Sequence, residues 1–158
     1  MLLISTVYFI YIGTAYAQPE LPPRTITAVA TQPIDFGKFI VTGNGTITVN
    51  YDGTRSATGG VIVIPSSIVQ PAIFEIKLCQ GREVTITYDP FVYINGDNGG
   101  SLKLNVGDTE KGPSGSHFPV TSDCNFITTL RVGGTLEVTG GSPTGIYTGS
   151  FSIDFTQE

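Results

Sequence analysis

The sequence predicts an all-β protein that folds as a single β-sandwich. Short stretches rich in β-branched and aromatic residues are separated, about every eight to twelve residues, by clusters of Gly, Pro, Asn and Asp, which is typical of a sandwich or barrel. Within several stretches apolar and polar residues alternate, as in a strand with one buried face. No window shows the periodicity of an amphipathic helix. The length of the chain suits one hydrophobic core.

Residues 1–17 are expected to be a secretory signal. They form an almost unbroken apolar run ending in the small-x-small pattern Ala15-Tyr16-Ala17, after which signal peptidase cuts. Cleavage is therefore expected between Ala17 and Gln18. The run is shorter than the roughly twenty apolar residues that span a bilayer, so we expect no membrane span once the signal is removed. The protein is expected to be secreted or held at the cell surface, by way of the periplasm.

Residues 18–24, with the sequence QPELPPR, are expected to form an extended leader. Their prolines cannot donate to a β ladder or lie inside a helix. The sandwich domain is therefore expected to occupy 25–158.

The expected strands follow the leader in order, with bounds uncertain by about two to four residues. They are Thr25–Ala30, Ile34–Val41, Thr46–Asp52, Gly60–Ile64, Ala72–Cys79, Glu83–Tyr88, Ser101–Val106, Phe126–Val132, Thr135–Val138 and Ile146–Thr156. Ile47, Val49 and Tyr51 alternate with polar residues, which predicts one buried and one exposed face. The run 61–64 is apolar on both faces, which predicts a central or covered position.

The last expected strand is the most regular of the set. Its inward residues are expected to be Tyr147, Gly149, Phe151, Ile153 and Phe155, with Thr, Ser and Asp between them. The expectation is one long amphipathic strand whose outer edge has no later strand to cover it. Because unpaired edges promote association, either an internal strand or a neighbouring chain should pair there.

Glycine-rich stretches are interpreted as turns or bulges between strands. Gly59-Gly60, Gly133-Gly134 and Gly140-Gly141 fit such positions, and Asn44-Gly45-Thr46 is interpreted as a hairpin turn. The run 95–100, NGDNGG, faintly resembles a calcium loop, but it lacks the distal glutamate of an EF-hand and is better explained as a turn.

The cysteine count and the charge limit the chemistry and the partners. Cys79 and Cys124 are the two cysteines of a chain expected in an oxidising compartment, where such a pair forms a disulfide. The net charge of −5 repels nucleic acid, whose binding depends on Lys and Arg. Nucleic acid is therefore not an expected partner.

No enzymatic site is expected. His117 is the single histidine and lies in a Gly- and Ser-rich loop, so no base stands beside a nucleophile. Asp35-Phe36-Gly37 spells a kinase signature without the other kinase motifs, so Phe36 is interpreted as a core residue and Gly37 as a bend. No cofactor and no metal are expected.

Four segments carry a resemblance to a family of uncharacterised secreted bacterial β domains. They are Ile34–Gly37, Gly53–Val61 (GTRSATGGV), Val132–Leu136 (VGGTL) and Gly145–Phe151. Their order and spacing match from about Thr25 to Phe155. The ending also resembles, over a shorter stretch, the final strand of fimbrial and spore-coat subunits assembled by the chaperone–usher route.

The second resemblance implies an immunoglobulin-like, pilin-like sandwich that lacks a strand, which an N-terminal extension of the next subunit supplies. The candidate donor is 25–31, with Ile26, Ala28 and Ala30 facing a neighbour's groove. The candidate acceptor edge lies around Tyr147, Phe151, Ile153 and Phe155. The implied function is that of a pilus-like or coat subunit that self-associates or joins other surface subunits, with a periplasmic chaperone and usher as partners.

A secreted adhesin or binding module is the alternative function. It would recognise a glycan or a protein through the expected loops Asp89–Gly100 and Asp108–Asp123. Phe91, Tyr93 and Phe118 could then form a small apolar patch.

Overall fold

The structure, a computed structural model, describes residues 25–65, 67–79, 83–121, 123 and 125–157. The predicted signal 1–17, its cleavage point at Ala17 and Gln18, the leader 18–24 and Cys124 lie outside the described residues. The Cys79–Cys124 disulfide therefore stays a prediction. None of the described segments forms a helix of the length and apolarity needed to cross a bilayer.

The described secondary structure is entirely β and forms two sheets, which confirms the predicted fold class at that level. The strands are β1 (Thr25–Gln32), β2 (Phe39–Val49), β3 (Arg55–Val63), β4 (Ala72–Cys79), β5 (Glu83–Tyr88), β6 (Phe91–Gly96), β7 (Ser101–Thr109), β8 (His117–Pro119), β9 (Thr128–Val138), β10 (Tyr147–Thr148) and β11 (Ile153–Gln157). The larger sheet has the order β1-β4-β9-β7-β6-β10, with the β2–β3 pair joined to β9, and the smaller sheet has the order β11-β5-β8.

Strand β9 is central because two strands share one of its edges. Its first part, 128–132, pairs with β4, and its second part, 134–138, pairs with β2. Gly133 lies at the junction, where a Cβ atom would stand 2.6 Å from the carbonyl oxygen of Val49. The prediction that Gly133-Gly134 separates two strands is therefore wrong, since both residues lie within β9 and let a second backbone approach.

Strand β2 joins two segments that the sequence separated. The predicted hairpin turn at Asn44-Gly45-Thr46 is wrong, because these residues lie inside β2, next to a register shift between Val41 and Gly45. A Cβ atom on Gly45 would meet the carbonyl oxygen of Thr58, so glycine permits the close β2–β3 contact here. The Gly59-Gly60 pair lies inside β3, and Gly59 has a φ of 64°, a left-handed value that suits glycine.

The C-terminal segment is not one strand, contrary to the prediction. Strand β10 pairs with β6 in the larger sheet, whereas β11 pairs with β5 in the smaller sheet. Gly149 lies in the crossing between them, so close to Ile94 that a Cβ atom would contact its side chain at 2.5 Å. The chain thus changes sheets while Phe151 keeps its side chain half-buried.

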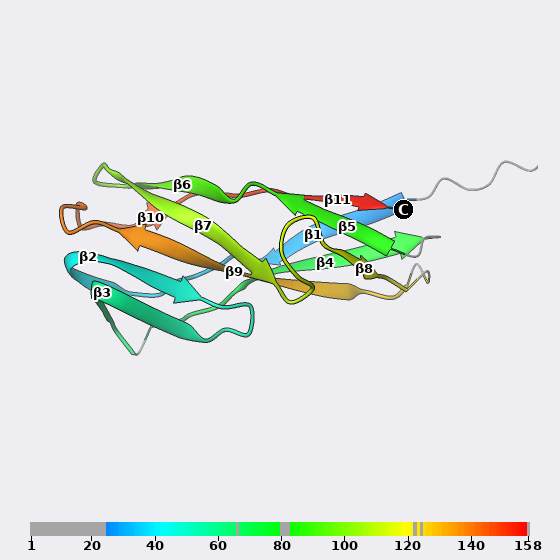
Figure 1. The fold of residues 1–158 in the computed structure, drawn as a ribbon, viewed down its shortest axis with the longest axis horizontal. Coiled ribbons are helices and arrows are strands. Elements are labelled where there is room, and N and C mark those ends of the chain that lie inside the picture. Colours follow the sequence, from blue (N-terminus) through cyan, green and yellow to red (C-terminus); the bar gives the residue numbers. More distant parts are fainter. Residues whose placement is uncertain (1–24, 66, 80–82, 122, 124, 158) are drawn as a thin grey trace, which may run out of the picture.

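The core has two clusters, which define two halves of an elongated molecule (Figure 1). The closed half contains β1, β4, the first part of β9 and the smaller sheet. Its fully buried side chains are Ile76, Leu78, Val84, Ile86, Leu130 and Val132. The open half contains β2, β3, β6, β7, β10 and the second part of β9, and its fully buried side chains are Ile47 and Val49. No described strand of the smaller sheet contributes to the core of the open half.

Candidate functional site: an apolar groove in the open half

A groove of about 1350 Å³ runs along the inner face of the open half. Its volume exceeds the roughly 300–1,000 Å³ of a pocket for a small molecule. The floor is formed by side chains of β6, β7 and β9 that the strand alternation points inward. They are Ile94, Leu102, Leu104, Leu136 and Val138. These residues are only 2–7% exposed, so the walls shield the floor from water while leaving space between them.

One wall is formed by residues 33–41, which lead into β2 and include its first residues. Phe36, Phe39 and Val41 line the groove there. The backbone of Asp35 pairs with that of Gln70 through N···O distances of 2.9 and 3.0 Å, which ties the segment to the chain before β4. The interpretation of the Asp35-Phe36-Gly37 motif is confirmed in its structural sense. Phe36 is 9% exposed in the core, and Gly37 has a φ of 72°.

Arg55 holds this wall in place. Its Nη1 atom donates to the carbonyl oxygen of Phe36 at 3.2 Å, and its Nη2 atom donates to that of Ile64 at 3.0 Å. Nη1 also donates to the hydroxyl of Ser67 at 3.0 Å. No local sequence signal indicates this role, because a single arginine in a strand is ordinarily solvated. Its planar guanidinium presents five N–H donors in a fixed fork, so it can donate to several oxygen atoms at once.

The opposite wall is the segment 142–151, in which Tyr147 and Phe151 line the groove. The Tyr147 hydroxyl donates to the carbonyl oxygen of Pro143 at 2.7 Å. The turn after β6 supports this wall, since Asp97 Oδ1 accepts the backbone N–H of Ile146 at 2.9 Å. The interpretation of 95–100 as a turn is confirmed, because it joins the antiparallel pair β6 and β7.

Both rims of the groove offer unpaired backbone. Residues 39–41 pair with β3 on one side, while the β9 ladder includes only 45–49 of β2. Residues 149–151, which line the groove, form no backbone pair with any other described residue. Unpaired N–H and C=O groups along an extended segment are the template for an added strand. The groove can therefore bind an extended peptide through main-chain hydrogen bonds and apolar side chains together.

The structure separates the predicted acceptor residues. Tyr147 and Phe151 line the groove, whereas Ile153 and Phe155 belong to β11 and pack in the closed half. The Phe151 and Phe155 rings both contact that of Phe74, with centroids 6.2 and 6.1 Å apart.

The candidate donor strand pairs within its own chain. Strand β1 lies at the edge of the larger sheet, antiparallel to β4, with Ile26 opposite Leu78. Ile26 is half-buried, whereas Ala28 and Ala30 are exposed. The expectation that these three residues face a neighbour's groove stays a prediction. Ala30 lies at an end of the groove.

The segments expected to be ligand-binding loops are partly ordered as strands. Asp89–Gly100 contains β6, and Asp108–Asp123 contains β8. Phe118 is 4% exposed, so it does not form a surface patch with Phe91 and Tyr93. His117 is exposed on β8.

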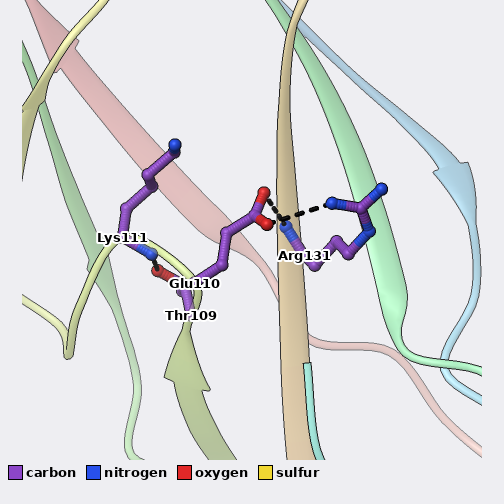
Figure 2. A network of polar contacts seen from close by, with 4 residues as sticks. All are labelled: Thr109, Glu110, Lys111 and Arg131. Atoms are coloured by element: carbon purple, nitrogen blue, oxygen red, sulfur yellow. Dashed lines mark hydrogen bonds and ion pairs between the residues drawn. The ribbon is translucent and has the colours of Figure 1, made fainter. Parts of the chain in front are cut away.

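The turn after β7 is attached to β9. Figure 2 shows Glu110 reaching Arg131, whose Nη1 atom lies 3.0 Å from Oε2 and whose backbone N–H donates to Oε1 at 3.3 Å. Thr109 Oγ1 accepts the backbone N–H of Lys111 at 3.0 Å. Within the described ranges, no three His, Cys, Asp or Glu side chains come together as ligands for a metal ion.

A family model described as a domain of unknown function, DUF4402, matches residues 25–156. Among curated proteins and among solved structures, no match to the chain is found.

Proposed function

The chain belongs to the DUF4402 family of unknown function, and on that premise we propose that it is a non-enzymatic, exported structural subunit whose groove receives a strand from a neighbouring subunit. The sandwich is of the immunoglobulin-like, pilin-like kind. In this proposal the Cys79–Cys124 disulfide stabilises the fold by roughly 3–4 kcal/mol, because it lowers the chain entropy of the unfolded state. Its place is a bacterial surface polymer or coat.

The observation that carries this proposal is the apolar groove with unpaired backbone on both rims. Protein interiors are packed with few voids larger than a water molecule, so an apolar volume of about 1350 Å³ beside the core favours an occupant. A neutral, extended and partly apolar segment matches both the lining and the unpaired rims. During export, a periplasmic chaperone would fill the same groove until an usher brings the subunits together.

Strand β1 of another copy is the proposed occupant. It is an edge strand that pairs with β4, and Ile26 is its single half-buried apolar side chain, so release from β4 loses little burial. Released β1 exposes backbone groups that a neighbour's rims can pair. Because β1 pairs with β4 and reaches only an end of the groove, the rest of the groove of the same chain stays available to a partner.

The test is binding of a fluorescent peptide, TITAVATQ (25–32), to the full mature chain, followed by anisotropy. Ser150 is an exposed groove residue, and Ser152 is exposed but does not line the groove. We expect the Ser150→Trp side chain to fill the groove and abolish peptide binding. The matched Ser152→Trp variant should bind the peptide as the unsubstituted chain does. Equal peptide binding by both variants, or none by the unsubstituted chain, would contradict strand acceptance.

A secreted adhesin or binding module is the second candidate function. The observation that favours it is a pair of exposed aromatic rings, Phe91 and Tyr93, on the outer face of β6. The support for this function thus comes from a sheet face and not from loops.

A further inference from the structure

The outer face of the open half carries two aligned rows of side chains across five strands. Cross-strand register places one residue of each row on β6, β7, β9, β2 and β3 in turn. The first row is Phe91, Asn105, Thr135, Thr48 and Ser56, and the second row is Tyr93, Lys103, Glu137, Thr46 and Thr58. These residues, here named the outer platform, point away from the groove because their neighbours along each strand form its floor and the core.

The aromatic end of the outer platform is exposed and held in position. Phe91 is 43% exposed and Tyr93 is 61% exposed, with their ring centroids 5.8 Å apart at an angle of 82°. The Nζ atom of Lys103 lies 5.0 Å from the Phe91 centroid, a cation–π distance. The two rings thus present a fixed apolar surface to solvent, although burying them would be worth more to folding.

The polar part of the outer platform is preorganised by hydrogen bonds. Glu137 Oε1 accepts from Asn105 Nδ2 at 2.7 Å and from Lys103 Nζ at 3.1 Å. The hydroxyls of Thr48 and Thr135 lie 2.9 Å apart, and those of Thr46 and Thr58 lie 2.7 Å apart. The surface therefore offers ordered amide, carboxylate and hydroxyl groups beside the rings, and the charges of Lys103 and Glu137 cancel.

We propose that the outer platform binds an extended, uncharged polysaccharide. The C–H faces of pyranose rings pack on aromatic rings, and sugar hydroxyls exchange hydrogen bonds with amide, carboxylate and hydroxyl groups such as those of Asn105 and Glu137. With strands about 4.8 Å apart, each row is roughly 19 Å long, enough for several sugar rings. Because the platform is an open sheet face without enclosing walls, a chain that contacts many side chains binds better than a single sugar.

The composition of the outer platform favours this ligand over other macromolecules. Apart from the two aromatic residues, its members are hydroxyl, amide or charged residues, so a protein partner would find no dry apolar core. Nucleic acid needs unpaired Lys or Arg, whereas Lys103 is engaged with Glu137. The inference is independent of strand acceptance by the groove, and it gives the binding-module function a site and a ligand class.

The experiment is affinity electrophoresis of the full mature chain through gels containing hydroxyethylcellulose, xylan, galactomannan or dextran. We expect at least one polysaccharide to retard the chain, and Tyr93→Ala to weaken that binding about tenfold. Tyr51 is a similarly exposed tyrosine, at 44%, outside the outer platform. The Tyr51→Ala variant is therefore the matched control and should migrate as the unsubstituted chain does.

Other outcomes overturn the inference. Migration unchanged in every gel, equal retardation of the Tyr93→Ala variant, or an equal loss in the Tyr51→Ala variant would each do so. If the unsubstituted chain captures a protein, the Tyr93→Ala variant does not, and no polysaccharide retards the chain, then the ligand of the outer platform is a protein and not a polysaccharide. The groove variant Ser150→Trp should keep polysaccharide binding, so that failure of strand acceptance and failure of this inference are told apart.

Discussion

The closed and open halves share one sheet and one central strand, yet they are completed differently. In the closed half, β5, β8 and β11 form a second layer that packs on β4 and β9. In the open half, the layer opposite β6, β7 and β9 consists, among the described residues, only of the chain leading into β2, the first residues of β2 and the crossing from β10 to β11. The first arrangement is a packed sandwich, and the second leaves a groove.

This difference shows that a sheet face can be apolar without its own chain filling the layer above it. The same alternation places Leu130 in a core with 0% exposure and Leu104 on the floor of a groove. The alternation of inward apolar and outward polar side chains is the same in both halves. What differs is the number of strands that reach the second layer, and the open half therefore has capacity to bind another segment.

The largest expected effect compares a leucine in the core of the closed half with a leucine on the floor of the groove. Leu130→Ala should lower the free energy of unfolding by roughly 2–5 kcal/mol, because it leaves a cavity in a packed core. Leu104→Ala should cost clearly less, since its side chain already borders open volume. Urea unfolding of both variants measures the difference. Equal losses would mean that the open half is packed as tightly as the closed half.

The next effect concerns the junction of the halves. An Ala at position 133 would place its Cβ atom 2.6 Å from the Val49 carbonyl oxygen and 2.9 Å from the Tyr51 nitrogen. Gly133→Ala should therefore destabilise the fold by about 1–3 kcal/mol through overpacking. Gly141→Ala is the control, because nothing lies within 4 Å of its Cβ position. Thermal unfolding that gives equal midpoints for both variants would show that the end of β2 can move away from β9.

A smaller effect is expected for the wall of the groove. Arg55→Ala removes the donors to the carbonyl oxygens of Phe36 and Ile64, at a cost of about 1 kcal/mol for groups that are partly hydrated. Hydrogen exchange should speed up at the Asp35 and Gln70 amides, and binding of the peptide 25–32 should weaken. Arg131→Ala, which removes an exposed ion pair, should change neither. Unchanged hydrogen exchange in the Arg55→Ala variant would mean that other residues hold this wall of the groove in place.

The smallest expected effect is a loss of stability in acid that begins in the open half. Hydrogen bonds from Asn105 and Lys103 lower the pKa of Glu137 below its usual range, and those from the side chain and backbone of Thr54 lower the pKa of Asp52. A folded-state pKa below the unfolded one stabilises at neutral pH, and this contribution is lost as the pH falls through the lowered value. Both groups are fully exposed, so the change is small.

Hydrogen exchange at neutral and at mildly acidic pH checks this expectation. Amides of β2, β3 and β7 should lose protection in acid before those of β4 and β5 do. The Glu137→Gln variant should reduce the difference between the halves. Earlier loss of protection in the closed half would contradict the assignment of these carboxylates as the acid-sensitive groups.

Several elements could be predicted from the sequence because their signals are local. Strands β4 and β5 have the bounds that were predicted, Ala72–Cys79 and Glu83–Tyr88. In both strands the alternation of side chains and the positions of the flanking turn residues indicate the same bounds. The core position of Phe36 and the turn at 95–100 were also predicted correctly, since an apolar residue before a glycine and an Asn-Gly-rich run have few other structural roles.

Other elements could not be predicted, because glycine has more than one use. At Gly45 and Gly133 the absence of a side chain permits two backbones to approach, which resembles a turn signal in the sequence. Strand β6 lies in the segment 89–100, which was interpreted as a loop, and its apolar residues Phe91 and Tyr93 are exposed on the outer face of the sheet. The role of Arg55 depends on carbonyl groups that come from distant parts of the chain.

The sequence by itself determined the β class, most strand positions and the inward or outward direction of side chains, because alternation along a strand is a local property. The tertiary structure alone decided which strands share an edge of β9, where the C-terminal segment changes sheets, and that β1 pairs with β4 in its own chain. It also decided that the open half contains a groove. These features depend on how many strands reach the second layer, and pairing between distant segments is set by the packing of the whole chain.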